Sequence, residues 1–128
     1  MILKGNPIGW FEIYADDMER ARRFYETVLD TSLERLGDPA DVGVEMWSFP
    51  LNMENYGCGG TLVKADRMRA GGNSVMVYFS CEDCAQEESR IGAAGGKVER
   101  SKMSIGEYGF VTIAIDTEGN VFGLHSLK

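Results

Sequence analysis

The fold is decided by residues 8–29, IGWFEIYADDMERARRFYETVL, in which a run of strand-forming residues is followed at once by an amphipathic helix. The strand-like run at 8–14 ends just before the acidic residue Asp16. Apolar side chains then recur every three or four residues over 18–29, which predicts a helix with one apolar stripe. Asp16 and Glu19 have the spacing of a capping box at the start of this helix.

The same order of elements returns about 66 residues later, in residues 74–94, SVMVYFSCEDCAQEESRIGAA. A second strand is predicted at 74–80, and a second helix with a thinner apolar stripe at 84–94. Three short extended segments are predicted after each helix, at 32–36, 44–49 and 59–63 and again at 97–103, 110–115 and 121–125. The sequence therefore predicts an α+β protein, a single domain over residues 1–128 made of two βαβββ modules at about 1–66 and 67–128.

Four segments carry a resemblance to a known family: WFEI (10–13), DDMERARRFY (16–25), GGKV (95–98) and DTEGNVFGL (116–124), in that order. Together they resemble the vicinal oxygen chelate superfamily, which includes glyoxalase I, bleomycin-resistance proteins and extradiol dioxygenases. The resemblance implies that the two modules curl into a cupped mixed sheet around a cavity. It also implies a homodimer.

The resemblance places the metal ligands of the family at four positions, because each module supplies one ligand from its first strand and one from its last. In this sequence the first-strand positions fall on Trp10 and Met76, and the last-strand positions on Gly123 and the glycine-rich stretch 57–60. Indole and glycine offer no side-chain ligand atom, and a thioether is too soft for hard oxygen-chelating chemistry. We therefore predict no metal site and no cofactor.

Strand alternation divides the remaining side chains between the core and the cup. Phe11, Ile13, Val75, Val77 and Phe79 are expected in the core. The candidates for lining the cup and binding a ligand are Trp10, Glu12, Tyr14, Met76, Tyr78 and His125, with Trp47 and Tyr108 as further stacking surfaces for a flat molecule. Tyr56 could add to this stacking surface.

Two of these candidates, a carboxylate and an imidazole, can ionise at or below neutral pH, and each has two interpretations. Glu12 stands between aromatic residues, so it could bind a cationic ligand or act as a general base, or be a solvated or hydrogen-bonded structural residue. His125 is the single histidine, so it could do acid–base work near neutral pH, or be a partly exposed structural residue.

The cysteines and glycines do not indicate other chemistry. Cys81 and Cys84 have the spacing of a two-thiolate motif but replace apolar residues, so we expect them to fill the core as reduced thiols. Cys58 has no evident partner. The glycine-rich stretch 57–60 lacks the Lys and Ser or Thr of a phosphate loop, so nucleotide binding is not indicated.

The charge and hydropathy of the chain limit its partners. With 13 basic and 20 acidic residues the net charge is −7, so nucleic acid is not an expected partner. The sequence contains neither an apolar run long enough for a membrane helix nor a signal-peptide run at 1–7, so we expect a cytoplasmic protein that does not contact membranes.

Three functions stay open at this point. The first is a metal-independent binding protein of the bleomycin-resistance type, which holds a small aromatic or cationic molecule in its cup. The second is a lyase, isomerase or dioxygenase of the same superfamily that recruits a divalent metal through Glu12 and His125, with a residue from a second subunit. The third is a partner domain with an exposed apolar patch and no pocket.

Overall fold

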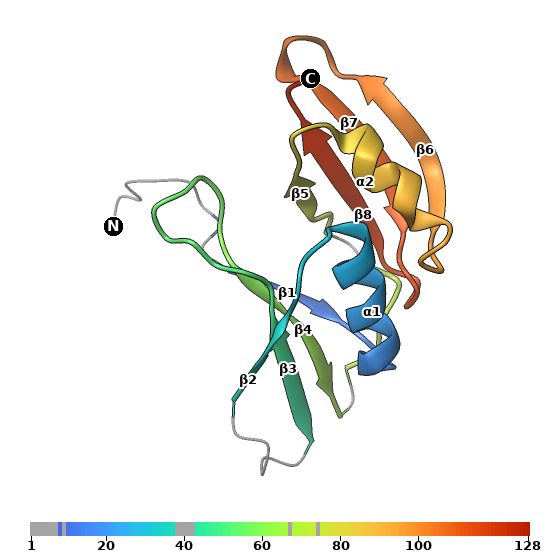
Figure 1. Ribbon diagram of the computed structural model, residues 1–128. Helices are drawn as coiled ribbons and strands as arrows, with labels where there is room; N and C mark the ends of the chain where they lie inside the picture. Colours follow the sequence, from blue (N-terminus) through green and yellow to red (C-terminus); the bar gives the residue numbers. More distant parts are fainter. Residues whose placement is uncertain (1–7, 9, 38–42, 67, 74) are drawn as a thin grey trace.

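The computed structural model describes residues 8, 10–37, 43–66, 68–73 and 75–128, which form two similar halves (Figure 1). The first half consists of β1 (Phe11–Tyr14), α1 (Met18–Val28), β2 (Glu34–Leu36), β3 (Val44–Ser48) and β4 (Gly60–Ala65). The second consists of β5 (Tyr78–Ser80), α2 (Cys84–Ile91), β6 (Lys97–Ser104), the 3₁₀ helix η1 (Gly106–Tyr108), β7 (Phe110–Ile115) and β8 (Val121–Ser126). The α+β class and the predicted order βαβββ are confirmed in both halves.

Each half builds one four-stranded sheet, with the strand orders β1-β4-β3-β2 and β5-β8-β7-β6. In both sheets the first strand runs parallel to the last, and the other neighbours are antiparallel. The parallel pairs join Phe11 to Gly60 in the first sheet and Tyr78 to Gly123 in the second. β1 and β5 are therefore edge strands of their own sheets.

The first strand of each half is shorter than predicted. β1 begins at Phe11 rather than at residue 8, and β5 begins at Tyr78 rather than at residue 74. The positions Gly9, Ser74 and 1–7, on which parts of the predictions fell, lie outside the described residues. The expected core position of Val75 is wrong: this side chain is 71% exposed, because the strand alternation that would bury it begins three residues later.

The helices also end earlier than predicted, and α1 begins on a different cap. Asp17, not Asp16, is the N-cap of α1, and its carboxylate accepts a hydrogen bond from the backbone N–H of Arg20 at 3.1 Å. α1 ends at Val28 and α2 ends at Ile91. With 11 and 8 residues, neither helix is long and apolar enough to cross a membrane, and the described residues hold no other α-helix.

A cluster of aromatic rings joins the two halves beneath the sheets. Tyr25 of α1 is fully buried, and its ring centroid lies 5.6 Å from that of Phe49, 5.7 Å from that of Phe79 and 5.6 Å from that of Phe122. Phe49 belongs to the first half, whereas Phe79 and Phe122 belong to β5 and β8. Because these rings come from both modules, the halves share one core.

The hairpin between β7 and β8 binds the N-terminal end of α1. Glu118, whose side chain is 1% exposed, accepts hydrogen bonds through Oε1 from the backbone N–H groups of Asp16 and Asp17, at 2.9 and 2.8 Å. Its Oε2 accepts from Nε of Arg20 at 2.6 Å. The carboxylate thus satisfies backbone donors that begin a helix in the other half of the chain, where negative charge is favoured. Gly119 has a positive φ of +85°, which the tight turn of this hairpin requires.

We predict that replacing Glu118 by Gln weakens the fold in a pH-dependent way. Burial alone would raise the pKa of Glu118, but hydrogen bonds from Arg20, Asp17 N–H and Thr117 hold the pKa below its ordinary value. A lowered folded-state pKa stabilises the protein above the unfolded-state pKa, and this stabilisation is lost as the pH falls. Glu118→Gln should therefore cost about 2 kcal/mol at pH 7, and the difference from the wild type should shrink below about pH 4.

The measurement is urea unfolding of both proteins between pH 3 and pH 7. Glu19→Gln, which removes an exposed carboxylate from α1, is the matched control and should change the unfolding free energy by less than about 0.5 kcal/mol. A difference between Glu118→Gln and the wild type that stays constant down to pH 3 would contradict the role given to this carboxylate.

Candidate functional site

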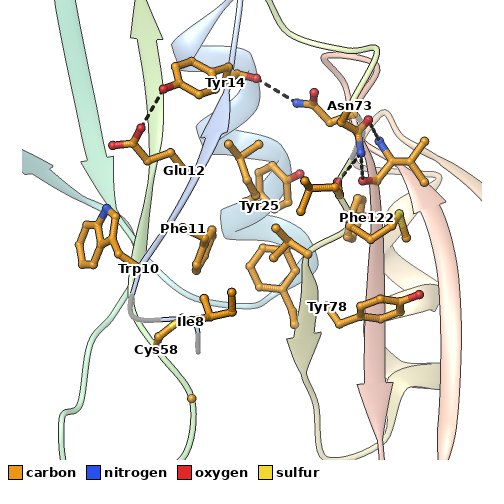
Figure 2. A pocket seen from close by; sticks show the side chains of 18 of the residues that line it. Ile8, Trp10, Phe11, Glu12, Tyr14, Tyr25, Cys58, Asn73, Tyr78 and Phe122 are labelled. Atoms are coloured by element: carbon orange, nitrogen blue, oxygen red, sulfur yellow. Dashed lines mark hydrogen bonds between the residues drawn. The ribbon is translucent and has the colours of Figure 1, made fainter. Parts of the chain in front are cut away.

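An open cleft of about 1220 Å³ lies between β1 and β5 (Figure 2). Phe11 and Phe79, whose ring centroids are 5.9 Å apart, bring the two edge strands together at its floor. Tyr25 and Phe122 complete this apolar lining. A cleft of this volume accommodates a small molecule of drug size, and an aromatic lining is typical of such sites.

The first wall of the cleft carries Trp10, Glu12 and Tyr14, which follow one another at every second position (Figure 2). The hydroxyl of Tyr14 donates a hydrogen bond to Oε1 of Glu12 at 2.8 Å. This bond, together with burial and the negative charge of Glu12, raises the pKa of Tyr14, so the hydroxyl keeps its proton near neutral pH. Oε2 of Glu12 makes no hydrogen bond to any described residue, so it is available to a ligand.

The position of this wall is fixed from the second half of the chain. Nδ2 of Asn120, at the start of β8, donates to the backbone carbonyl of Tyr14 at 2.9 Å. Oδ1 of Asn120 accepts from the backbone N–H of Gly71 in the connecting segment at 2.7 Å. The exposed side chain of Arg69 comes from the same segment and also lines the cleft. Among the described residues that line the cleft, Glu12 therefore supplies the one carboxylate and Arg69 the one guanidinium.

The second wall carries Met76 and Tyr78. Figure 2 shows Tyr78 across the aromatic floor from Trp10. The ring of Tyr78 lies over Gly123, and a Cβ atom at position 123 would overlap the Cδ1 and Cε1 atoms of that ring. Tyr78 is 49% exposed, so the ring face that does not contact the sheet is open to the cleft.

Five of the eight candidate residues come together on this cleft: Trp10, Glu12, Tyr14, Met76 and Tyr78. The other three lie elsewhere. The indole of Trp47 lies on the helix side of its sheet, with the guanidinium of Arg22 3.6 Å from its ring centroid. Ligand binding by the five that line the cleft stays a prediction.

Tyr108 and His125 lie together away from the cleft. Nε2 of His125 is 2.7 Å from the backbone carbonyl of Tyr108, so the imidazole is occupied by a local contact. The hypothesis of an atypical metal site requires His125 and Glu12 to converge. Within this chain they do not, because Glu12 lines the cleft and His125 contacts Tyr108 outside it. The backbone contact agrees with the structural reading of His125.

Three lining residues, Ile8, Pro50 and Cys58, were not named from the sequence. Ile8 stands two residues before Trp10, so the alternation over 8–14 could have indicated it. Pro50 and Cys58 line the cleft from the loop between β3 and β4, whose course strand alternation cannot give. Tyr56 also lines the cleft from this loop and is 88% exposed; its role as a stacking surface stays a prediction.

The four ligand positions of the metal-using relatives do not fit a metal ion in this chain. The backbone N–H of Ala15 binds the carbonyl of Val63 at 2.8 Å, as that of Cys81 binds the carbonyl of His125 at 2.7 Å. Residue 63 is therefore equivalent to residue 125, and the fourth ligand position falls on Thr61 rather than on the stretch 57–60, which corrects the prediction.

With Thr61 as the fourth position, the four side chains remain unsuitable for binding a metal ion. Thr61 offers only a neutral hydroxyl, and the ring of Tyr78 occupies the space above Gly123 where a ligand side chain would stand. Across the described part of the chain, no group of three or more His, Cys, Asp or Glu side chains could hold an ion.

The family model described as Glyoxalase/Bleomycin resistance protein/Dioxygenase superfamily matches residues 7–124. The chain belongs to this superfamily. No curated protein matches the sequence closely enough to name a function. The resemblance found in the sequence and the α+β fold predicted from it are thereby confirmed.

Solved structures of the superfamily share the fold. An antibiotic binding protein from Streptomyces sp. CB03234, TnmS3, is 20% identical with a TM-score of 0.65, over 99% of this chain and all (100%) of that protein. A glyoxalase/bleomycin resistance protein from Albidiferax ferrireducens T118 is 17% identical with a TM-score of 0.64, over 93% of this chain and 98% of that one. Glyoxalase I from Zea mays is 19% identical with a TM-score of 0.72 over 91% of this chain, which spans only 43% of the maize enzyme.

We predict that, of the three cysteines of the folded protein, Cys58 reacts rapidly with a thiol reagent and the other two do not. Cys58 is exposed and lines the cleft, whereas Cys84 is buried. Burial, with the nearby Glu87 and Cys84, raises the pKa of Cys81 to about 12, so at pH 8 only ~1 in 10,000 of its thiols is ionised. An aromatic disulfide reagent at pH 8 should detect one fast thiol in the wild type and none in Cys58→Ser. Two fast thiols in the folded wild type would contradict this environment for Cys81.

Proposed function

We propose that this protein binds a small, flat, positively charged organic molecule in the cleft between β1 and β5, without a metal ion. The proposal rests chiefly on one observation: the cleft places an unshared carboxylate oxygen of Glu12 next to aromatic side chains and above an aromatic floor. An aromatic wall attracts a flat ring and, through its negative face, also a cation. The carboxylate supplies the opposite charge.

Three further observations support this proposal. The net charge of −7 favours the approach of cations. The four metal-ligand positions carry side chains that bind hard ions poorly, so binding of the kind used by metal-dependent relatives lacks its ligands. TnmS3, which has the same fold and nearly the same length, is described as an antibiotic binding protein. The fold alone would not choose between binding and catalysis.

The proposal includes a homodimer in the cytoplasm. Met53 and Tyr56 of the loop between β3 and β4 are each 88% exposed, and exposed apolar side chains of this size favour contact with a second copy. Size-exclusion chromatography with light scattering would test the dimer by the mass that it returns.

Thermal melting in the presence of EDTA tests the binding function. The probes are proflavine, a flat cation; acridine-9-carboxylate, a flat anion; and dicyclohexylammonium, a cation of similar size that is not flat. At ten times its dissociation constant, proflavine should stabilise the protein by about 1.4 kcal/mol, or about 5 °C in melting temperature. The other two probes should stabilise it less, because each lacks one of the two features that the cleft recognises.

Glu12→Gln isolates the charge contribution. Removing one partly exposed ion pair should weaken proflavine about threefold and leave acridine-9-carboxylate unchanged or slightly stronger. Glu99→Gln makes the same charge change on β6, outside the cleft, and is the control. The proposed function would be rejected if no flat probe stabilised the protein in EDTA and Zn²⁺ or Ni²⁺ stabilised it in a parallel melt without EDTA.

A further inference from the structure

The second wall of the cleft has a feature that side-chain chemistry alone does not reveal: an aromatic ring lies on a glycine of the sheet. The ring of Tyr78 covers Gly123 of β8. The first wall differs, because a Cβ atom at Gly59, just before β4, would meet Cδ1 of Leu51 at 2.8 Å and only then Cζ3 of Trp10 at 3.2 Å. Both rings belong to the cleft lining.

Neither glycine is explained by the conformation of its backbone. Gly59 and Gly123 are not among the glycines of positive φ, so another residue would not be strained there by its backbone. At Gly123 a side chain is excluded because a Cβ atom there would overlap the Tyr78 ring. The absence of a side chain therefore lets the ring lie down against the sheet.

A ring held in this way presents its face rather than its edge to the cleft. Tyr78 is 49% exposed although one face of its ring lies against the sheet, and Trp10 on the other wall is 43% exposed. The exposed part of each ring is therefore directed into the cleft, which these two residues border from opposite walls (Figure 2). Neither ring stacks on an aromatic neighbour among the described residues, whereas the rings of the floor form a continuous cluster.

We infer that the ring of Tyr78, backed by Gly123, is a stacking platform that receives one face of a planar aromatic ligand, and that Gly123 determines specificity by keeping this platform flat. This inference rests on the proposed function and specifies it: the ligand's ring system lies on Tyr78, and its cationic group points to Glu12. A glycine without ligand contact of its own thus acts through the ring that covers it.

A double-mutant cycle at Tyr78 and Gly123 tests this inference, with proflavine as the probe and its fluorescence anisotropy as the readout. Tyr78→Ala removes the platform and should weaken binding about fivefold, the effect of losing one aromatic stacking partner. Tyr78→Phe keeps the ring and should stay within about twofold of the wild type. Gly123→Ala should weaken binding about as much as Tyr78→Ala, because its methyl group displaces the ring.

The cycle is decided by the double variant. In the Tyr78→Ala background no ring remains to be displaced, so adding Gly123→Ala should not weaken binding further. Gly92→Ala is the matched control, because a Cβ atom at this helix-terminal glycine meets nothing within 4 Å and its backbone is helical. The control should bind proflavine as the wild type does.

The possible failures are distinguishable. If proflavine binds the wild type but Gly123→Ala binds equally well, or weakens binding by the same factor with and without the Tyr78 ring, the platform is overturned while the proposed function stands. If proflavine does not bind the wild type, both are overturned. Should Gly123→Ala not fold, as judged by its melting curve, the comparison of Tyr78→Phe with Tyr78→Ala still decides whether the ring is a platform.

Discussion

The whole arrangement depends on one buried carboxylate that joins the two modules. Glu118 comes from the hairpin of the second module, yet it accepts the backbone N–H groups of Asp16 and Asp17, where the first module turns from strand into helix. Asn120, two residues further on, donates a hydrogen bond from Nδ2 to the backbone carbonyl of Tyr14. The hairpin therefore sets where β1 ends relative to β8, and with it the distance between the two walls of the cleft.

The cleft follows from this constraint and from the aromatic core. Tyr25 packs against rings from both modules, and Phe11 meets Phe79 at the floor, so β1 and β5 are held near each other without pairing. Two edge strands that are close but unpaired leave an opening between them. In this chain the described lining of the opening consists of rings, the carboxylate of Glu12 and the guanidinium of Arg69 instead of metal ligands, so binding energy must come from stacking, burial and charge.

The sequence predicted the fold well because its signals repeat. The stripe in 18–29 and the order of strands after each helix are local patterns, and the structure reproduces them with ends shifted by a few residues. Val75 shows where local patterns fail: alternation cannot tell at which residue a strand begins. The binding of Asp16 and Asp17 by Glu118 joins residues about a hundred positions apart, and no local pattern encodes such a contact.

The residues that line the cleft were predicted in part, because strand alternation is a local pattern and indicates only residues on strands. Trp10, Glu12 and Tyr14 were found because they alternate on one strand, whereas Pro50 and Cys58 reach the cleft from a loop. Trp47 was placed wrongly in the cup because an exposed indole and one that packs under Arg22 look alike in a sequence. The role of Gly123 could not be read from the sequence, since it depends on the ring that lies over it.

The most direct test of the central claim, ligand binding without metal, uses the emission of Trp10. In Trp47→Phe, Trp10 is the only tryptophan left, and it borders the cleft. Titration of this variant with proflavine in EDTA should shorten the Trp10 emission lifetime and saturate at one ligand per chain. A lifetime that stays unchanged in EDTA, and shortens only after a divalent metal ion is added, would contradict the claim.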